Sequence, residues 1–430
     1  MFRYLKLENF KNFRQATLPM GPFTVLVGTN ASGKSNLRDA FRVLHGLSRG
    51  YTVAETLGEK WIEGGALQWR GIRGGTREAA FHGCQNFTLE VGFSLEDEED
   101  SGILREASYR VEVNVGSIST PPHIEAESLV VSGYQHPIFT AKREPHHEGS
   151  FFLLINYDGL NPGEADAGPH IDYDDDRLAL PQLPSDPFFY HPTAKHYARA
   201  TIRVLESIRF LDLSPDAMRL PSLPGQTILG DRGENLSSVL QAICLNSSTR
   251  NALVEWVRAL TPLDVVDFEF VQDQIGRILV TLVEQGGRRV SAYSASDGTL
   301  RFLAIIAALL GPHPAHFYFF EELENGIHPT RLHLLTSLIE RKVPQSSIQV
   351  VASSHSPQLL SLLSTESFQH ASLLYRSEGQ PDARIRRILD IPEAARVVRE
   401  QAPAALHASG WFEDAMAFAE ETDSQPEATS

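Results

Sequence analysis

The apolar and polar positions of the first 50 residues predict buried strands that lead into a helix. Residues 4–7 alternate, and residues 23–27 are almost continuously apolar, as in a parallel strand that is buried on both faces. A Gly-rich turn follows, and apolar residues then recur at helical spacing from Lys34 onward. The positions that share this helical face are Leu37, Ala40, Phe41 and Leu44.

The region after residue 290 has the pattern of an α/β series. We expect a helix over about 298–310, a strand at 317–320, a second helix over about 329–342 and a strand at 348–353. Strands that alternate with helices typically form a parallel sheet with right-handed crossovers. This part of the chain therefore predicts a parallel sheet.

The middle of the chain is less regular. Residues 87–93 and 109–115 alternate like antiparallel strands, and helices are expected over about 194–207 and from residue 235 onward. Residues 155–195 are rich in Pro, Gly, Asp and His, which predicts a long loop or an insertion.

Composition limits the cellular setting of the protein. Apolar residues make up 42% of the chain, enough for a substantial core, and only two cysteines occur, which favours a reducing compartment. The first residues turn polar too early for a signal peptide. No apolar run approaches the roughly 20 residues that cross a bilayer. We therefore expect a cytoplasmic protein that contacts no membrane.

The net charge of −16 argues against generic DNA binding. Nucleic-acid backbones are held by clusters of Lys and Arg that release counterions, and no run of five basic residues occurs here. Any nucleic-acid surface must therefore be local, or be supplied by an oligomer or a partner.

Residues Gly28–Ser35 fit the pattern G-x-x-x-x-G-K-[ST] of a phosphate loop. Its glycines let backbone N–H groups face an anion, and the following helix N-terminus adds partial positive charge. Lys34 is expected to contact the β- and γ-phosphates of ATP, and the Ser35 hydroxyl to ligate Mg²⁺. A chance match is disfavoured because a buried strand precedes the motif and an amphipathic helix follows it.

Two carboxylates, Glu321 and Glu322, end the apolar strand at 317–320. In open α/β sheets, ligands bind at the carboxyl ends of the strands. One acid can hold Mg²⁺, and the next can orient or deprotonate an attacking water. The alternative is a strand that merely exits to solvent through acidic residues, which a phosphate loop earlier in the chain disfavours.

Two further segments, the turn at 296–298 and His355, indicate a function only when their order along the chain is considered. The turn Ser296–Asp297–Gly298 opens a helix and could present N–H groups and hydroxyls to an anion, but taken alone it reads better as a simple helix cap. His355 follows the strand at 348–353 and could touch a γ-phosphate. A hydrogen-bonded turn histidine is the alternative.

The order of phosphate loop, Ser-Asp-Gly turn, acid pair and histidine resembles the ABC-type ATPase heads of the RecF, SMC and OLD (overcoming lysogenisation defect) group. The likeness covers about residues 1–50 and 290–360 well and the middle only in outline. The segments that carry it are LENFKNF at 7–13, the Walker A motif at 28–37, the signature-like turn at 296–298, the Walker B and D-loop at 321–329, and the switch-type His355.

This resemblance implies an α/β fold, a P-loop NTPase head of the ABC type. Its central sheet would be mostly parallel, with an antiparallel β lobe and an inserted helical lobe. We expect one discontinuous ATPase domain over residues 1–410, with a core at 1–95 and 285–400 and the inserted lobe at about 96–284. The tail at 421–430 is expected to be disordered.

The resemblance also implies site residues and a mechanism. Two heads would sandwich two ATP molecules, with Glu322 as the catalytic base, His355 as the γ-phosphate sensor, and Ser35 and Glu321 holding Mg²⁺. Hydrolysis would then release the dimer. The implied nucleotide-binding residues are Gly28, Asn30, Ser32, Gly33, Lys34, Ser35, Asn36, Ser296, Asp297 and Gly298.

The chain departs from the family pattern in several places. Glu321 stands where Asp is usual and Leu323 where Pro is usual, and the longer acid could shift the metal or slow turnover. Gln68 and Gln85 are both candidates for the Q-loop glutamine. No heptad pattern predicts a coiled coil, and the residues after His355 are too few for the Toprim nuclease domain of OLD proteins, so a nuclease would be another polypeptide.

Three functions follow from these predictions. The first is an ATP-gated, DNA-associated machine that forms a homodimer or a higher oligomer and controls a nuclease or another effector, in DNA repair or anti-phage defence. The second is a regulatory scaffold whose ATPase state holds and releases a protein effector without contacting DNA. A transporter motor is disfavoured because no coupling helix can be recognised.

Overall fold

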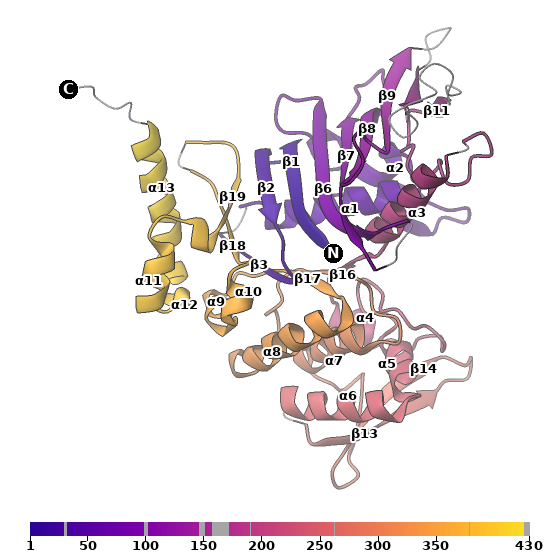
Figure 1. The fold of residues 1–430 in the computed structure, drawn as a ribbon. Coiled ribbons are helices and arrows are strands. Elements are labelled where there is room, and N and C mark those ends of the chain that lie inside the picture. The colour runs from indigo at the N-terminus through magenta and orange to yellow at the C-terminus, as the bar shows by residue number, and fades with distance from the viewer. Residues whose placement is uncertain are drawn as a thin grey trace. The chain divides into compact units, whose positions relative to one another are not determined.

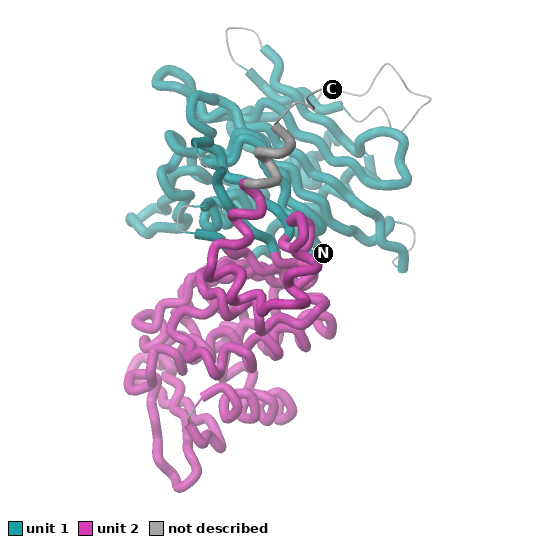
Figure 2. Tube along the Cα trace, turned by 90° about the vertical axis from the view of Figure 1, so that its left-hand side faces the viewer, with its two compact units in different colours: residues 1–21, 28–208, 372–387 teal, residues 22–27, 209–371, 388–430 magenta. Residues whose placement is uncertain are grey.

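The computed structural model describes residues 1–29, 32–98, 102–145, 151–156, 172–189, 191–261, 263–377 and 379–424. The chain divides into two compact units, which Figure 2 colours separately. Unit 1 comprises residues 1–21, 28–208 and 372–387, and unit 2 comprises residues 22–27, 209–371 and 388–430. The division into one core and one inserted lobe that the sequence suggested remains a prediction.

Unit 1 is built on an eight-stranded antiparallel sheet with the order β11-β10-β9-β8-β7-β6-β1-β2. Its strands are β1 (Phe2–Phe10), β2 (Phe13–Pro19), β6 (Asn86–Glu96), β7 (Leu104–Asn114), β8 (His123–Val131), β9 (Phe139–Pro145), β10 (Phe151–Asn156) and β11 (Asp172–Asp174). Figure 1 shows these long strands side by side. Alternate positions of β7 are buried, as expected for a sheet with one covered face.

The helices and short strands of unit 1 complete its core. They are α1 (Lys34–Ser48), α2 (Val53–Leu57), β4 (Glu59–Trp61), β5 (Leu67–Arg70), the 3-10 helix η1 (Gly75–Glu78), α3 (Pro192–Glu206), β18 (Ser372–Tyr375) and β19 (Arg384–Arg387). Helices α1 and α3 pack together, and Nδ1 of the buried His45 lies 3.0 Å from the carbonyl oxygen of Leu205. This contact fixes the end of α3 against α1.

Unit 2 contains the parallel strands. Four strands are neighbours in this order: β12 (Ile208–Leu211), β16 (Phe317–Phe320), β17 (Gln349–Ser353) and β3 (Phe23–Val27). Strand β12 belongs to this unit from Arg209 onward. The pairs β16–β17 and β17–β3 are parallel. Every residue of β3, β16 and β17 is buried, which explains their continuous apolar pattern.

The rest of unit 2 is helical, apart from a three-stranded antiparallel sheet. That sheet consists of β13 (Val265–Gln272), β14 (Ile278–Glu284) and β15 (Arg289–Ser291). The helices are α4 (Pro215–Met218), α5 (Leu236–Cys244), α6 (Ser247–Leu260), α7 (Asp297–Leu310), α8 (Pro329–Ser346), α9 (Pro357–Leu362), α10 (Thr365–Phe368), the 3-10 helix η4 (Ile388–Asp390), α11 (Ala394–Glu400), α12 (Pro403–Ala408) and α13 (Trp411–Ser424).

Most of the expected elements are present. The helix–strand–helix–strand series after residue 290 corresponds to α7, β16, α8 and β17, and β6 and β7 are the expected antiparallel pair. The long loop at 155–195 was only partly right. Within it β11 pairs with β10, while residues 157–171 lie outside the described residues. Helix α13 covers 421–424 of the expected disordered tail, and 425–430 lie outside the described residues.

Candidate functional site: a phosphate loop and an acid edge

The phosphate loop has a backbone conformation that favours glycine at its first and sixth positions. Gly28 has φ +147° and Gly33 has φ +110°. A Cβ atom on Gly28 would lie 2.2 Å from the carbonyl oxygen of Leu374, and one on Gly33 would lie 2.7 Å from the ring of Phe13. The motif therefore needs both glycines for backbone geometry and for close packing.

Buried polar groups gather inside this loop. The ammonium of Lys34, whose residue is 6% exposed, donates to the carbonyl oxygens of Gly28 at 2.5 Å and Thr29 at 2.9 Å. The hydroxyl oxygen of Ser32 is buried without a hydrogen-bond partner among the described residues. Since buried polar atoms are nearly always paired, a loop that buries an ammonium and also a hydroxyl without a partner among the described residues fits an anion ligand.

The remaining loop residues have different surroundings. Ser35 is half-buried in the first turn of α1. The amide nitrogen of the Asn36 side chain donates to Oδ1 of Asn12 at 2.6 Å. Asn30 lies outside the described residues. The nucleotide contacts expected of these three residues remain predictions.

In unit 2, polar residues follow the ends of β16 and β17. We call this group, which consists of Glu321, Glu322, Glu324 and His355, the acid edge. In the strand register, Phe320 pairs with Ala352, and Ser353 pairs with Leu26 of β3. The carboxyl ends of the three strands are therefore level within about one residue. Glu321 and Glu322 leave β16 at this end.

Glu322 has an unusual backbone conformation for a non-glycine residue, with φ +48°. Its N–H donates to the hydroxyl of Ser353 at 3.1 Å, and its Oε2 accepts from the Asn325 amide at 3.3 Å. Residues held in this left-handed region concentrate at functional sites. The carboxylate is half exposed, and its Oε1 lies 3.8 Å from Nε2 of His355.

Glu324 fixes the position of the histidine backbone. Its Oε1 accepts from the N–H groups of His355 at 2.7 Å and Ser356 at 3.0 Å. The other oxygen, Oε2, is buried without a hydrogen-bond partner among the described residues. Sequence reasoning assigned Glu324 no role, because its partners lie some 30 positions further along the chain.

The Ser-Asp-Gly turn opens α7 as a capped helix. The Ser296 hydroxyl accepts from the Thr299 N–H at 3.2 Å, so the simple cap that the sequence left open is present. The Asp297 carboxylate pairs with the Arg219 guanidinium at 2.6 Å. Nothing in the sequence identified Arg219 as the partner of this turn.

A hollow of about 620 Å³ in unit 2 adjoins this turn. A Cβ on Gly298 would lie 2.6 Å from the carbonyl oxygen of Gly326, so a close backbone approach requires glycine there. The residues that line the hollow include Ser296, Gly298, Phe302, Gly326, His328 and Arg331. The signature-like turn and the D-loop segment thus share one cavity, which the sequence did not predict.

The fold and these motifs define a class of protein. A Walker A loop, buried parallel strands and an acid pair at a strand end make this chain an α/β P-loop ATPase head, of the ABC type that the sequence predicted. A family model described as "AAA domain, putative AbiEii toxin, Type IV TA system" matches residues 23–100 and 166–361, which is more than half of the chain. The chain belongs to this family.

Comparisons with curated proteins and with solved structures do not narrow the family further. No curated protein matches the sequence. Among solved structures, the chain is similar to an Smc head bound to the C-winged helix domain of ScpA (14% identity, TM-score 0.49, 90% of this chain and 97% of that chain covered). It is also similar to an Smc head derived from Pyrococcus furiosus (12%, 0.48, 93% and 98%) and to an SMC head domain from Thermotoga maritima (12%, 0.40, 90% and 98%). Membership of the RecF or OLD branch remains a prediction.

Proposed function

We propose that this protein hydrolyses ATP with Mg²⁺, using the phosphate loop and the acid edge on one nucleotide. One observation carries the proposal. Gly28 directly follows Val27, the last residue of β3, and the ends of β3, β17 and β16 are level in the strand register. Ligands of open α/β sheets bind at such carboxyl ends.

The chain offers suitable groups for the cation. A half-buried hydroxyl on Ser35 and a half-buried carboxylate on Glu321 are oxygen donors of the kind that Mg²⁺ prefers. When bound, the ion would neutralise charge on the phosphate oxygens. Glu322 would take a proton from the attacking water, and His355, 3.8 Å from that carboxylate, would sense the γ-phosphate.

We further propose that two copies assemble around ATP. The hollow beside Ser296 and Gly298 supports this part, because it presents the capped start of α7 in a cavity large enough for a ligand. The exposed Asp297 is also among the residues that line the hollow, and it is paired to Arg219. In such a dimer, this turn of one copy would face Lys34 of the other.

The ATPase cycle would control an effector. The first candidate effector is a partner that processes DNA or acts in anti-phage defence. The runner-up is a scaffold that holds and releases a protein without contacting DNA, which the net charge of −16 favours. Among the described residues no helix is both long and apolar enough to span a bilayer. We keep the expectation of a cytoplasmic protein.

Hydrolysis of ATP by the purified chain, with and without Mg²⁺, tests the proposal. Lys34→Ala removes the charged donor and should weaken ATP binding by about 100-fold or more. Arg77→Gln, which changes an exposed cation of unit 1, is the matched control and should bind ATP normally. Mg²⁺-independent turnover, or a Lys34→Ala protein that binds ATP as well as the control, would contradict the assigned site.

A further inference from the structure

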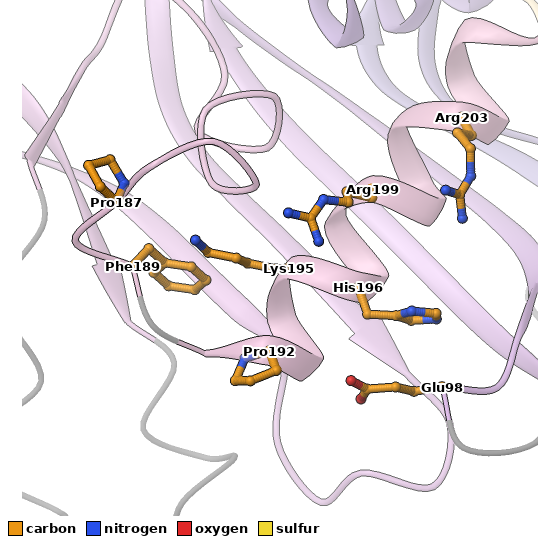
Figure 3. Close-up of a pocket in the computed structure, with 8 residues that line it drawn as sticks. All are labelled: Glu98, Pro187, Phe189, Pro192, Lys195, His196, Arg199 and Arg203. Atoms are coloured by element: carbon orange, nitrogen blue, oxygen red, sulfur yellow. The ribbon is translucent and has the colours of Figure 1, made fainter.

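A cavity of about 500 Å³ on α3 of unit 1 lies outside the site described above. The residues that line it include Glu98, Lys195, His196, Arg199 and Arg203, and Figure 3 shows the cationic side chains spaced along the helix. We propose that this α3 cavity is a second anion site, which binds phosphate groups independently of the phosphate loop.

The helix concentrates positive charge on one face. Lys195, Arg199 and Arg203 are four residues apart, so they follow one stripe, with about 6 Å of rise between neighbours. The opposite face is buried and includes Tyr197 and Leu205. Helix α3 therefore cannot rotate to hide the stripe. Among the described residues that line the cavity, three cations face one carboxylate, that of Glu98, and so form a local positive cluster in a chain with a net charge of −16.

These cations have little to neutralise them inside the protein. The Lys195 ammonium donates to the carbonyl oxygen of Asp186 at 2.8 Å, and Arg199 donates to that of Pro184 at 3.0 Å. None of the three cations forms an ion pair with another described residue, whereas most arginines of unit 1 that line the large sheet do. Their charge is therefore available to a ligand.

His196 gives a second and independent indication of a ligand. Its Nε2 is buried and has no hydrogen-bond partner among the described residues, although the residue lines the cavity. A buried ring nitrogen without a partner costs free energy unless something bonds to it. A phosphate oxygen would accept a hydrogen bond from an N–H at Nε2 while the arginines supply charge-assisted bonds.

The dimensions favour a ligand with more than one phosphate. From Lys195 to Arg203 the helix rises by about 12 Å, which exceeds the size of a single phosphate. Phosphates in series occur both in a nucleic-acid strand and in a free polyphosphate. Glu98 would accept from a ligand hydroxyl or amine rather than bond to a phosphate oxygen.

Fluorescence anisotropy of a labelled single-stranded oligonucleotide, titrated with the Lys34→Ala protein at low salt, tests the proposal. The Lys34→Ala background removes binding at the phosphate loop, so this experiment can fail or succeed whatever happens to the ATPase proposal. Arg203→Gln should weaken binding about 5- to 10-fold and reduce the salt slope by about one, because one phosphate contact is lost. Arg203→Lys should bind nearly as well as the parent, and Arg77→Gln should change nothing.

Inorganic tripolyphosphate distinguishes the two sources of phosphate. If it displaces the oligonucleotide, the cavity accepts free polyphosphates, and if it does not, the cavity requires a strand. Either result supports a phosphate site, provided that Arg203→Gln weakens binding. The proposal is overturned if neither probe binds directly, or if Arg203→Gln and the double variant Arg199→Gln/Arg203→Gln bind as well as Arg77→Gln.

Discussion

The phosphate loop of unit 1 and the acid edge of unit 2 hold their functional groups by different means. In the loop, a buried lysine is bonded to the loop's own carbonyl groups, and two glycines adopt positive φ. At the acid edge, Glu322 and His355 are 50% and 40% exposed and are positioned by side chains from distant parts of the chain. Changes to the loop glycines should therefore affect folding, whereas changes to the exposed Glu322 should affect the rate.

The largest expected effect is on the rate, at Glu322. Glu322→Gln should lower the rate of ATP hydrolysis by roughly 10²- to 10⁴-fold, because it removes the base, and should leave ATP binding intact. The free energy of unfolding should change by no more than about 0.5 kcal/mol, since the side chain is half exposed. Steady-state kinetics and chemical denaturation measure the two quantities.

The same variant addresses assembly. If ATP holds two copies together, Glu322→Gln with ATP should elute as a dimer in size-exclusion chromatography, and without ATP as the smaller species. Glu366→Gln, an exposed acid elsewhere in unit 2, is the control and should hydrolyse ATP normally. Turnover by Glu322→Gln at the wild-type rate would remove Glu322 from the role of base.

A substitution in the loop should instead lower stability. Gly28→Ala places a Cβ 2.2 Å from a backbone carbonyl oxygen at a φ of +147°, which should lower the free energy of unfolding by about 4 kcal/mol. Gly50→Ala has a φ of +76° with no atom near the new Cβ, so it should cost only about 1 kcal/mol. Equal losses for both variants in urea denaturation would show that close packing at Gly28 is unimportant.

Unit 1 also buries a carboxyl group that should make its stability depend on pH. Glu127 accepts from the Tyr109 hydroxyl at 2.8 Å and from the N–H groups of Ala179 and Leu180. Burial raises the pKa of Glu127 to about 7 despite these bonds. A raised pKa in the folded state means that the contribution to stability is complete below about pH 4.5 and is lost as the pH rises through 7.

The expected loss is about 3 kcal/mol between pH 4.5 and 7, measured as the free energy of unfolding in urea at several pH values. Glu127→Gln should flatten this part of the profile, because its side chain does not titrate. Glu78→Gln, an exposed acid of unit 1, should keep the slope. A profile of Glu127→Gln parallel to that of the wild type would mean that another group causes the pH dependence.

A smaller effect on stability is expected at Glu324, which links the segment after β16 to the segment after β17. Glu324→Ala leaves the N–H groups of His355 and Ser356 without their acceptor, and should lower the free energy of unfolding by about 2 kcal/mol. Because His355 would lose its fixed position, kcat should fall while KM changes little. Glu340→Ala removes a similar bond, to the Ser364 N–H, and should affect stability without affecting kcat.

Sequence reasoning succeeded where a local pattern dictates the backbone. The strand at 23–27, the glycines of the phosphate loop and the helix from Lys34 are encoded by neighbouring residues, and all three are present. Strand β16 and its acids are encoded in the same way. Short-range patterns therefore identified the class of protein.

Long-range pairings were beyond such reasoning. In the eight-stranded sheet, β1 lies between β2 and β6. Strand β2 follows β1 directly in the sequence, whereas β6 begins about 75 residues after β1 ends. The bonds of Glu324 to His355 and of Arg219 to Asp297 span 31 and 78 positions. Pairing at this separation depends on the whole fold, and no spacing rule in one sequence encodes it.

Ser35 and Glu321 are proposed to act on the same cation beside one ATP. A double-mutant cycle tests this directly. It compares the wild type, Ser35→Ala, Glu321→Gln and the double variant. Calorimetry measures the ATP affinity of each, once in excess Mg²⁺ and once in the presence of a chelator. With a shared cation, each single variant should lose the Mg²⁺-dependent gain in affinity, and the double variant should lose no more. Losses that add up would show two independent effects and would contradict the shared site.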